Sequence, residues 1–253
     1  MPIASILIPV YNREKIVEKT IAAALSQTVT DIEVIIVDNK STDNTYDICL
    51  NYSQHDNRIR LYKNDTNIGP VLNWVRCANL ATAPYSKLLF SDDLIANNYL
   101  EKTLPYMLSP ECSFVYTPAI IGEEEWKGTV NYQSYASDCK INKRVYVNTA
   151  AFMTQFVPVS PCAALFRTQD LRNNILTELP GIDDYDFTRY GAGVDWLIYM
   201  LTAINYNYVA YVSEPLVFFR SHSDSITIRN ENNMVNVGYS YAIDWFKTTF
   251  LKG

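Results

Sequence analysis

The chain has 253 residues, of which 48% are hydrophobic and 19% charged, and this composition excludes a disordered or coiled-coil protein. Its net charge of −6 argues against nucleic acid as a partner, because proteins that bind nucleic acid carry basic surfaces. The five cysteines are odd in number and form no C-x-x-C motif, which predicts reduced thiols in a cytoplasmic protein and no zinc site. The apolar N-terminal segment lacks a preceding basic region, and no apolar run reaches about 18 residues, so we expect neither a signal peptide nor a membrane span.

In the first half of the chain, short apolar segments alternate with segments of helical periodicity. The predicted strands are residues 6–10, 34–37, 58–62 and 88–90, and the predicted helices begin near residues 14, 44 and 71. Strands that are apolar on both faces and alternate with helices are typical of a parallel sheet covered on both sides. We therefore predict an α/β fold with a Rossmann-like, mostly parallel central sheet.

The alternation weakens in the second half. We predict strands at residues 113–117, 163–166 and 216–219, a helix from residue 194 and a C-terminal helix from about residue 232. Residues 122–144 show no period and are interpreted as a loop-rich insertion.

Polar residues follow each of the first four predicted strands. These segments are Tyr11-Asn12-Arg13, Asp38-Asn39, Lys63-Asn64-Asp65 and Ser91-Asp92-Asp93. Ligands of open α/β sheets bind outside the carboxyl ends of the strands, so the four segments predict one ligand site.

Several side chains at these strand ends suit a charged ligand. The pair Asp92 and Asp93 suits Mg²⁺ or Mn²⁺, although the two could instead cap a helix that starts near residue 97 or face water. Asp38 can accept a hydrogen bond from a base or ribose. Asn67 and Asn73 are candidate ligand contacts, with an ordinary loop as the alternative.

Four segments carry a family resemblance when they are taken together. SILIPVYNREKIVEKTIAAALSQT, IEVIIVDNKSTDNT, NIGPVLN and KLLFSDDL resemble, over roughly residues 3–110, the nucleotide-sugar domain of family 2 glycosyltransferases with the GT-A fold. The resemblance implies an inverting transferase that uses a nucleoside diphosphate sugar together with Mn²⁺ or Mg²⁺.

The resemblance also implies roles for individual residues. Pro9, Tyr11 and Asp38 would line the nucleoside pocket, Asp93 would be the metal ligand that ends the D-x-D motif, and Asp92 would contact the ribose or support the ligand. The chain departs from the family pattern at Ser91, where the motif usually begins with an acid, and at Asn39-Lys40, where D-D-G-S is usual.

The second half supplies a candidate base. In YGAGVDWLIYM, Asp195 opens a helix as the acidic residue of the family segment does, and the helix dipole would keep its carboxylate ionised. Glycines at positions 191 and 193 would let the backbone approach the acceptor. Helix capping is the alternative for Asp195, and the rival carboxylates are Asp183, Asp184 and Asp186.

LVFFRSHSDSIT resembles the late strand of the family that ends in Arg-x-His. The resemblance implies that His222 coordinates the metal and that Arg220 faces the diphosphate. A structural or solvated histidine is the alternative.

The family resemblance implies one GT-A domain over residues 1–253. Its nucleotide-sugar half would span about 1–110, and its acceptor and base half, with the C-terminal helix, about 111–253. The expected reaction transfers a sugar, from a UDP-sugar in first place, to a hydroxyl of a bacterial surface glycan such as O-antigen of lipopolysaccharide or capsule. The acceptor would be carried on polyprenyl diphosphate, in the cytoplasm or at the inner face of the membrane, where the aromatic C-terminal helix could contact lipid or a partner subunit.

Two other functions remain open. A sugar nucleotidyltransferase also binds metal on such a sheet, but it would need a Gly-rich loop after the first strand, where this chain has YNREK. A non-catalytic nucleotide-sugar-binding protein would not need the acids that the chain retains at Asp38, Asp93 and Asp195.

Overall fold

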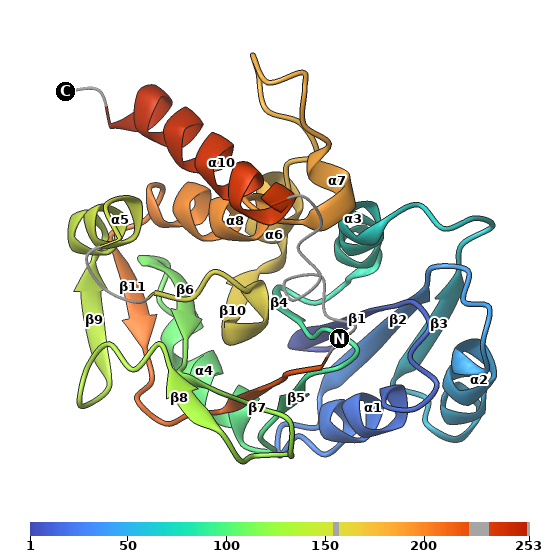
Figure 1. The fold of residues 1–253 in the computed structure, drawn as a ribbon. Helices are drawn as coiled ribbons and strands as arrows, with labels where there is room; N and C mark the ends of the chain where they lie inside the picture. The colour runs from blue at the N-terminus through green and yellow to red at the C-terminus, as the bar shows by residue number, and fades with distance from the viewer. Residues whose placement is uncertain (154–156, 223–232, 252–253) are drawn as a thin grey trace.

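The computed structural model describes residues 1–153, 157–222 and 233–251 and shows a large mixed sheet between two layers of helices (Figure 1). The strands of this sheet are β1 (Ala4–Val10), β2 (Ile32–Asp38), β3 (Ile59–Lys63), β4 (Tyr85–Leu88), β6 (Cys112–Tyr116), β9 (Cys139–Asn142), β10 (Ala164–Arg167) and β11 (Tyr208–Tyr211). Their order in space is β3-β2-β1-β4-β10-β6-β11-β9.

The first four strands form the parallel half of the sheet. β1 lies between β2 and β4 and is parallel to both, and β2 is parallel to β3. β10 runs antiparallel to β4 and β6, while β11 is parallel to β6. The predicted α/β fold with a mostly parallel sheet is therefore confirmed.

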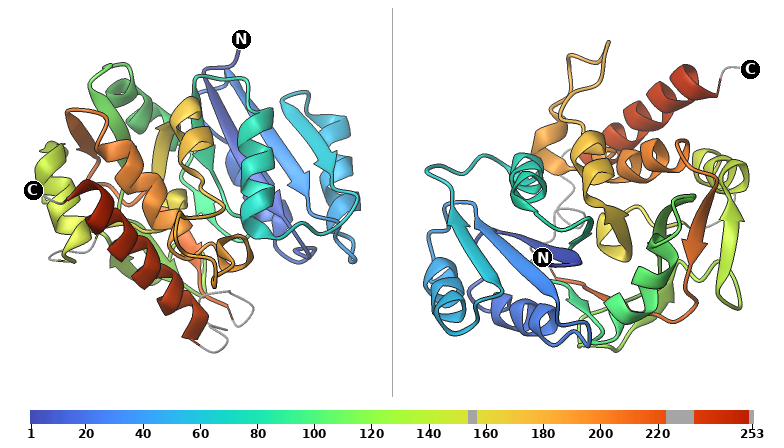
Figure 2. Two further views of the ribbon diagram at one scale, coloured as in Figure 1. Left: turned by 90° about the horizontal axis from the view of Figure 1, so that it is seen from above. Right: turned by 180° about the vertical axis from the view of Figure 1, so that it is seen from behind.

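Helices cover both faces of the sheet (Figures 1 and 2). One layer contains α1 (Val17–Leu25), α2 (Thr45–His55) and α4 (Tyr99–Met107), and the other contains α3 (Pro70–Leu80), α5 (Lys143–Ala151), α6 (Thr168–Asn174), α7 (Phe187–Tyr190), α8 (Val194–Ala203) and α10 (Met234–Phe250). A short 3₁₀ helix, η1 (Pro161–Ala163), precedes β10. None of the helices in the described ranges has both the length and the apolar character needed to cross a bilayer.

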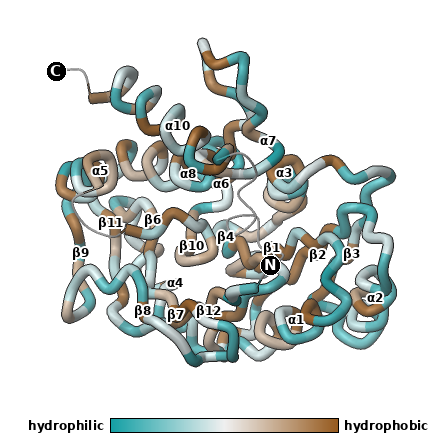
Figure 3. The backbone as a smooth tube through the Cα atoms, viewed as in Figure 1, coloured by the Kyte–Doolittle hydropathy of each residue, from teal (hydrophilic) through white to brown (hydrophobic). Residues whose placement is uncertain are grey.

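The alternation of side chains along β1 explains why both faces are covered. Leu7 packs with Val71 and Trp74 of α3, whereas Ile6 and Ile8 belong to the core cluster on the opposite face. Successive side chains of a strand point to opposite faces, so a wholly apolar strand needs a helix on each side. The apolar residues accordingly concentrate in the strands and the inner helix faces (Figure 3).

A second, four-stranded sheet joins the two halves of the chain. It contains β5 (Leu94–Ile95), β7 (Ala119–Gly122), β8 (Thr129–Asn131) and β12 (Val217–Arg220) in the order β5-β12-β7-β8. β5 follows Asp93 directly, and β12 pairs with it in the antiparallel register Phe218 to Leu94. The end of β12 therefore lies beside the two acids that precede β5.

Two predictions about elements need refinement. Residues 122–144 contain the expected irregular stretches, but they also include β8, β9 and the start of α5. β9 pairs with β11, which lies far away in sequence, so its pairing leaves no local period. The strand expected at residues 88–90 is β4 at Tyr85–Leu88, whose polar Ser86 and Lys87 are completely buried and hide it from an apolar pattern.

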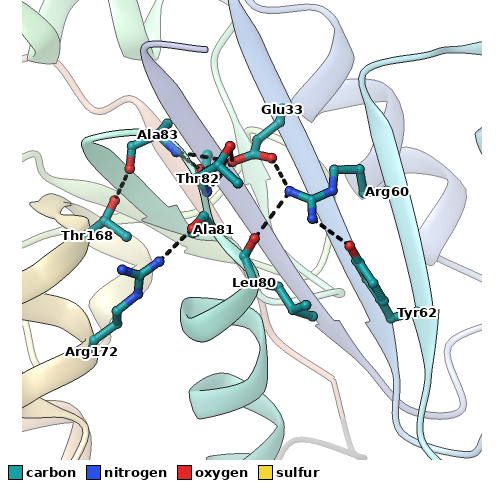
Figure 4. A network of polar contacts seen from close by, with 10 residues as sticks. Glu33, Arg60, Tyr62, Leu80, Ala81, Thr82, Ala83, Thr168 and Arg172 are labelled. Atoms are coloured by element: carbon teal, nitrogen blue, oxygen red, sulfur yellow. Dashed lines mark hydrogen bonds and ion pairs between the residues drawn. The ribbon is translucent and has the colours of Figure 1, made fainter. Parts of the chain in front are cut away.

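Glu33 interrupts the apolar sequence of β2 near the start of the strand, at the end opposite Asp38 (Figure 4). Glu33 Oε1 accepts hydrogen bonds from Ser5 Oγ (2.6 Å) and Thr82 N (2.6 Å), and Oε2 accepts one from Arg60 Nη1 (2.7 Å). Burial acts to raise the pKa of Glu33, but these hydrogen bonds outweigh it and lower the pKa. Glu33 thus ties β1, β2 and β3 to the turn before β4.

We expect Glu33→Gln to reduce the free energy of unfolding by about 2 kcal/mol at pH 7, because an amide leaves buried donors without an acceptor. The loss should shrink toward acid pH: the stabilisation is present above the ordinary glutamate pKa and disappears as the pH falls through the lowered folded value. Urea unfolding of both proteins between pH 4 and pH 7 measures this. Exposed Glu18→Gln is the control, and equal stability of the two variants at pH 7 would contradict the assignment.

Candidate active site

The carboxyl ends of β1, β2 and β3 lie level with one another. Val10 pairs with Asp38, and Asp38 pairs with Lys63, so the polar segments that follow these strands meet at one edge of the sheet, as predicted. Two hydrogen bonds join the loops after β1 and β2. Thr42 N donates to Asn12 Oδ1 (2.8 Å), and Asn12 N donates to Ser41 Oγ (3.0 Å). Asn12 has a left-handed backbone (φ 50°), which asparagine tolerates better than most residues.

The three residues expected to line a nucleoside pocket lie on this edge. Pro9 is buried within β1, Tyr11 follows the strand with 39% of its surface exposed, and Asp38 is fully buried at the end of β2. Asp38 Oδ2 accepts a hydrogen bond from Ser41 N (3.1 Å), so its own loop fixes the carboxylate.

The two asparagines expected to contact a ligand belong to a hydrogen-bonded group of amides. Asn73 is buried, its Oδ1 accepts from Asn64 Nδ2 (3.0 Å), and its Nδ2 donates to Val37 O (3.0 Å). Asn67 is exposed, and its Oδ1 accepts from Asn39 Nδ2 (2.8 Å). Asn73 therefore fixes the end of β2 against α3, whereas Asn67 lies at the surface of the site.

Asp92 is the acid that faces the other charged groups. Its Oδ2 lies 2.9 Å from His222 Nε2 and 3.5 Å from Arg13 Nη2, and all three side chains are partly exposed. Burial acts to raise the pKa of Asp92, but the hydrogen bond with His222 and the charge of Arg13 outweigh it and lower the pKa. Asp92 is therefore an anion at neutral pH.

Asp93 has the opposite environment. It is 6% exposed, and its Oδ1 accepts a hydrogen bond from Arg220 N (3.1 Å). Burial and the neighbouring charge of Asp92 raise the pKa of Asp93 well above its usual value. We expected Asp93 and His222 to share a metal, but the structure brings His222 to Asp92, because β12 pairs with β5 and directs its end to that side.

The guanidinium of Arg220 is engaged within the protein. Its Nε donates to Asp92 O (3.3 Å), and its Nη2 forms an ion pair with Glu125 Oε1 (3.2 Å). Only 13% of the side-chain surface of Arg220 is exposed. Arg220 thus stabilises the loop that contains Asp92 and Asp93, and its guanidinium already has partners within the protein.

A buried cation lies beneath the acids. Lys87 is fully buried in β4, its ammonium donates to Cys162 O, and it lies 4.2 Å from the ring centre of Tyr99. Burial lowers the pKa of Lys87 to about 8, against the charge of Asp93. The sequence analysis missed this residue, because its only signal is a lysine inside a short strand.

Asp92 and His222 are the side chains of this group that could hold a divalent metal. In the parts of the chain that the structure describes, no group of three or more His, Cys, Asp and Glu side chains is arranged to hold a metal ion. Asp92 Oδ2 and His222 Nε2 nevertheless offer an oxygen and a nitrogen donor that Mn²⁺ accepts, and such ions commonly complete their shells with water and substrate phosphates. The donor set therefore fits a metal that is shared with an anionic ligand.

Asp195 begins α8 and is held by three donors. Its Oδ1 accepts from Gly193 N (2.9 Å) and Trp196 N (2.8 Å), and its Oδ2 accepts from Tyr239 OH (2.6 Å). Burial raises the pKa of Asp195 to about 7 even though these hydrogen bonds favour the anion. The expectation that the helix dipole keeps Asp195 ionised was wrong, because the cost of desolvation is larger than the effect of the dipole.

The two glycines before Asp195 have a different purpose from the one expected. Both have left-handed backbones, with φ of 74° at Gly191 and 87° at Gly193. A Cβ atom at Gly191 would lie 2.4 Å from Trp74, and one at Gly193 would lie 2.5 Å from Gly238 O. The glycines therefore let Trp74 of α3 and the backbone of α10 approach the start of α8 closely.

The rival carboxylates lie outside this arrangement. Asp183, Asp184 and Asp186 are all exposed, and Asp186 Oδ1 caps α7 by accepting a hydrogen bond from Thr188 N (2.9 Å), two residues further along the chain. Asp184 Oδ2 accepts from Tyr241 OH (2.9 Å).

Tyr132 is affected by carboxylates on both sides of the site. Burial first, and to a smaller extent the charges of Asp195 and Asp93, raise the pKa of Tyr132 to about 12. Tyr132 follows β8 in the segment that we interpreted as a loop, and nothing in the local sequence pattern singles it out.

The fold defines an α/β protein whose polar strand ends form a candidate ligand-binding edge. Comparison with solved structures gives the same fold. S. aureus TarS, solved in complex with UDP-GlcNAc, aligns with a TM-score of 0.72 at 16% identity over 98% of this chain and 73% of TarS. The mannosyltransferase PcManGT of Pyrobaculum calidifontis, solved with GDP-Man and Mn²⁺, aligns with a TM-score of 0.58 at 14% identity over 100% of this chain and 76% of PcManGT.

Sequence comparison then identifies the family. The model of glycosyl transferase family 2 matches residues 5–173, so the chain belongs to this family, and the predicted GT-A fold is confirmed. WfgD of Escherichia coli, a UDP-Glc:alpha-D-GlcNAc-diphosphoundecaprenol beta-1,3-glucosyltransferase, is 29% identical over 146 residues, which are 55% of this chain and 57% of WfgD. The chain spans about half the length of the curated relatives that it matches.

We expect Asp195→Asn to raise the melting temperature, and to raise it more at pH 8 than at pH 5. A pKa of about 7 in the folded protein, against 3.8 for an ordinary aspartate, means that ionisation of Asp195 costs stability progressively as the pH rises between these values. An asparagine avoids this cost. Thermal melts between pH 5 and pH 8 measure the difference, with exposed Asp184→Asn as the control, and a difference that does not vary with pH would contradict the shifted pKa.

Proposed function

We propose that the protein is an inverting glycosyltransferase that moves a sugar from a nucleoside diphosphate sugar, a UDP-sugar in first place, to a hydroxyl of a glycan. The observation that carries the proposal is the pair of Asp92 Oδ2 and His222 Nε2, which lie 2.9 Å apart and would hold the metal of the donor. Asp195, a carboxylate with a pKa of about 7 at the start of α8, is the candidate base, and the charges of Asp195 and Asp93 both act on Tyr132. The UDP-GlcNAc bound to TarS and the UDP-Glc in the name of WfgD support the choice of donor.

Asp92 and His222 would hold Mn²⁺ or Mg²⁺, and this reassigns the ligand role that we first gave to Asp93. The metal, when bound, supplies positive charge to the diphosphate of the donor. Pro9, Tyr11 and Asp38 would contact the nucleoside. The GDP-Man and Mn²⁺ bound to PcManGT support a metal-dependent donor site in this fold.

Asp195 would act as the general base. Its Oδ2 takes the proton of the acceptor hydroxyl while the hydroxyl oxygen bonds to the anomeric carbon and the bond from that carbon to the diphosphate breaks. A single displacement of this kind inverts the anomeric configuration. A pKa near 7 suits a base that works at neutral pH. About half of the Asp195 carboxyl groups are then ionised, and the carboxylate still binds a proton well.

The acceptor would be a bacterial surface glycan on a polyprenyl diphosphate carrier, as the name of WfgD suggests for that protein. Exposed Phe152 and Met153 at the end of α5 and Phe250 at the end of α10, with Lys247 over the ring of Phe152 (4.9 Å), are suited to peripheral contact with a membrane. We propose that residues 1–253 act as one domain, with the donor half at about 1–110 and the acceptor half at about 111–253.

A panel of nucleotide sugars assayed for release of nucleoside diphosphate tests the donor side. We expect turnover with Mn²⁺ that is lost in EDTA, and we expect Asp92→Asn to weaken donor binding measured by calorimetry in the presence of Mn²⁺. Asp184→Asn is the matched control. Turnover in EDTA would contradict the metal proposal, and release of pyrophosphate in place of nucleoside diphosphate would indicate a nucleotidyltransferase.

The base is tested separately. We expect Asp195→Asn to reduce kcat at least about 100-fold, as loss of a general base does, while donor affinity stays unchanged. The α and β anomers of the product are distinguished by NMR, and inversion is expected. An unchanged kcat would contradict the role of Asp195 as the base. Donor binding without sugar transfer to any acceptor extract would indicate a non-catalytic binding protein.

A further inference from the structure

Tyr239 of α10 contacts the same carboxylate oxygen that the proposed reaction uses. Oδ1 of Asp195 already accepts two backbone N–H groups, so Oδ2 is the oxygen available for the proton of an acceptor. Tyr239 OH donates to this Oδ2 at 2.6 Å. An oxygen that accepts one hydrogen bond keeps a second lone pair, and the position of the donor decides where that lone pair points.

Tyr239 is held in place by backbone packing. A Cβ atom at Gly193 would lie 2.5 Å from Gly238 O, and a Cβ atom at Gly238 would lie 2.6 Å from Ala192 O. α10 therefore touches the start of α8 backbone to backbone, directly beside the contact of Tyr239 with Asp195. A second anchor is the hydrogen bond from Tyr185 OH to Met234 O (2.9 Å) in the first turn of α10.

We propose that Tyr239 is a positioning residue for the base Asp195: its hydroxyl holds Oδ2, stabilises the carboxylate and directs the remaining lone pair toward the acceptor hydroxyl. This inference rests on the proposed function. The hydrogen bond from Tyr239 favours the anion and partly offsets the effect of burial on the pKa of Asp195. Removal of this hydrogen bond therefore raises the pKa of Asp195 above about 7.

The phenols that surround Asp195 titrate at higher pH than its carboxyl group. Tyr239 of α10, Tyr132 after β8 and Tyr185 before α7 all have phenol pKa values raised by burial and, to a smaller extent, by the charge of Asp195. Asp93 is a second carboxyl group with a raised pKa. The titration of Asp195 is therefore identified by comparison with Asp195→Asn.

We expect Tyr239→Phe to move the acid limb of the pH profile of kcat upward by about one unit, as loss of one hydrogen bond to a carboxylate predicts. The rate at pH 7 should fall about fivefold and recover above pH 8.5, while KM for the donor stays constant. Tyr241→Phe is the matched control, because Tyr241 lies in the same helix and donates to exposed Asp184 (2.9 Å). Tyr239→Gln keeps an N–H donor and should restore part of the profile.

Carboxyl ¹³C NMR of the donor-free protein gives a readout that needs no activity. The resonance of Asp195, assigned by its loss in Asp195→Asn, should titrate about one unit higher in Tyr239→Phe than in the wild type and Tyr241→Phe. A shifted titration without any turnover would refute the proposed function and leave the contact established. Unchanged titration and an unchanged pH profile in a folded Tyr239→Phe, or in Tyr239→Leu, which also lacks the donor, if the first variant does not fold, would overturn the role of Tyr239.

Discussion

The neutralisation of two adjacent carboxylates at the end of β4 is the constraint on which the rest of the site depends. Asp92 and Asp93 repel each other and resist desolvation, so a chain that buries them needs cations and donors nearby. The protein meets this need from three directions: Lys87 lies below the pair, Arg13 comes from the loop after β1, and His222 comes from the end of β12. The small sheet is required for this arrangement, because pairing of β5 with β12 brings the last of these groups to Asp92.

The base side of the site shows the opposite balance. Asp195 has three hydrogen-bond donors and the start of a helix in its favour, yet burial still raises its pKa to about 7. A carboxylate that is costly to ionise binds a proton well, which is the property a base needs at neutral pH. The close packing of Gly193 on α10 brings Tyr239 to this carboxylate, and burial makes its ionisation costly, so stability and function conflict at this position.

Much of the first half could be predicted from sequence because its determinants are local. The strands at β1, β2 and β3 are wholly apolar, their polar ends follow directly in the chain, and parallel pairing brings those ends to one edge. The residues that were missed depend on distant partners. Glu33 interrupts an apolar strand, and Lys87 lies in a buried strand with a polar sequence. The roles of Tyr132 and Tyr239 depend on Asp195, which lies far from both in the sequence.

Residue type and spacing along the chain encode the alternation of strands and helices, the polar edge of the sheet and the membership of glycosyl transferase family 2. The folded arrangement determines which acid faces His222, what neutralises the pair of acids, and how strongly Asp195 holds its proton. Burial and distance set these properties, and both result from contacts between segments such as β5 and β12 or α8 and α10 that no local pattern encodes.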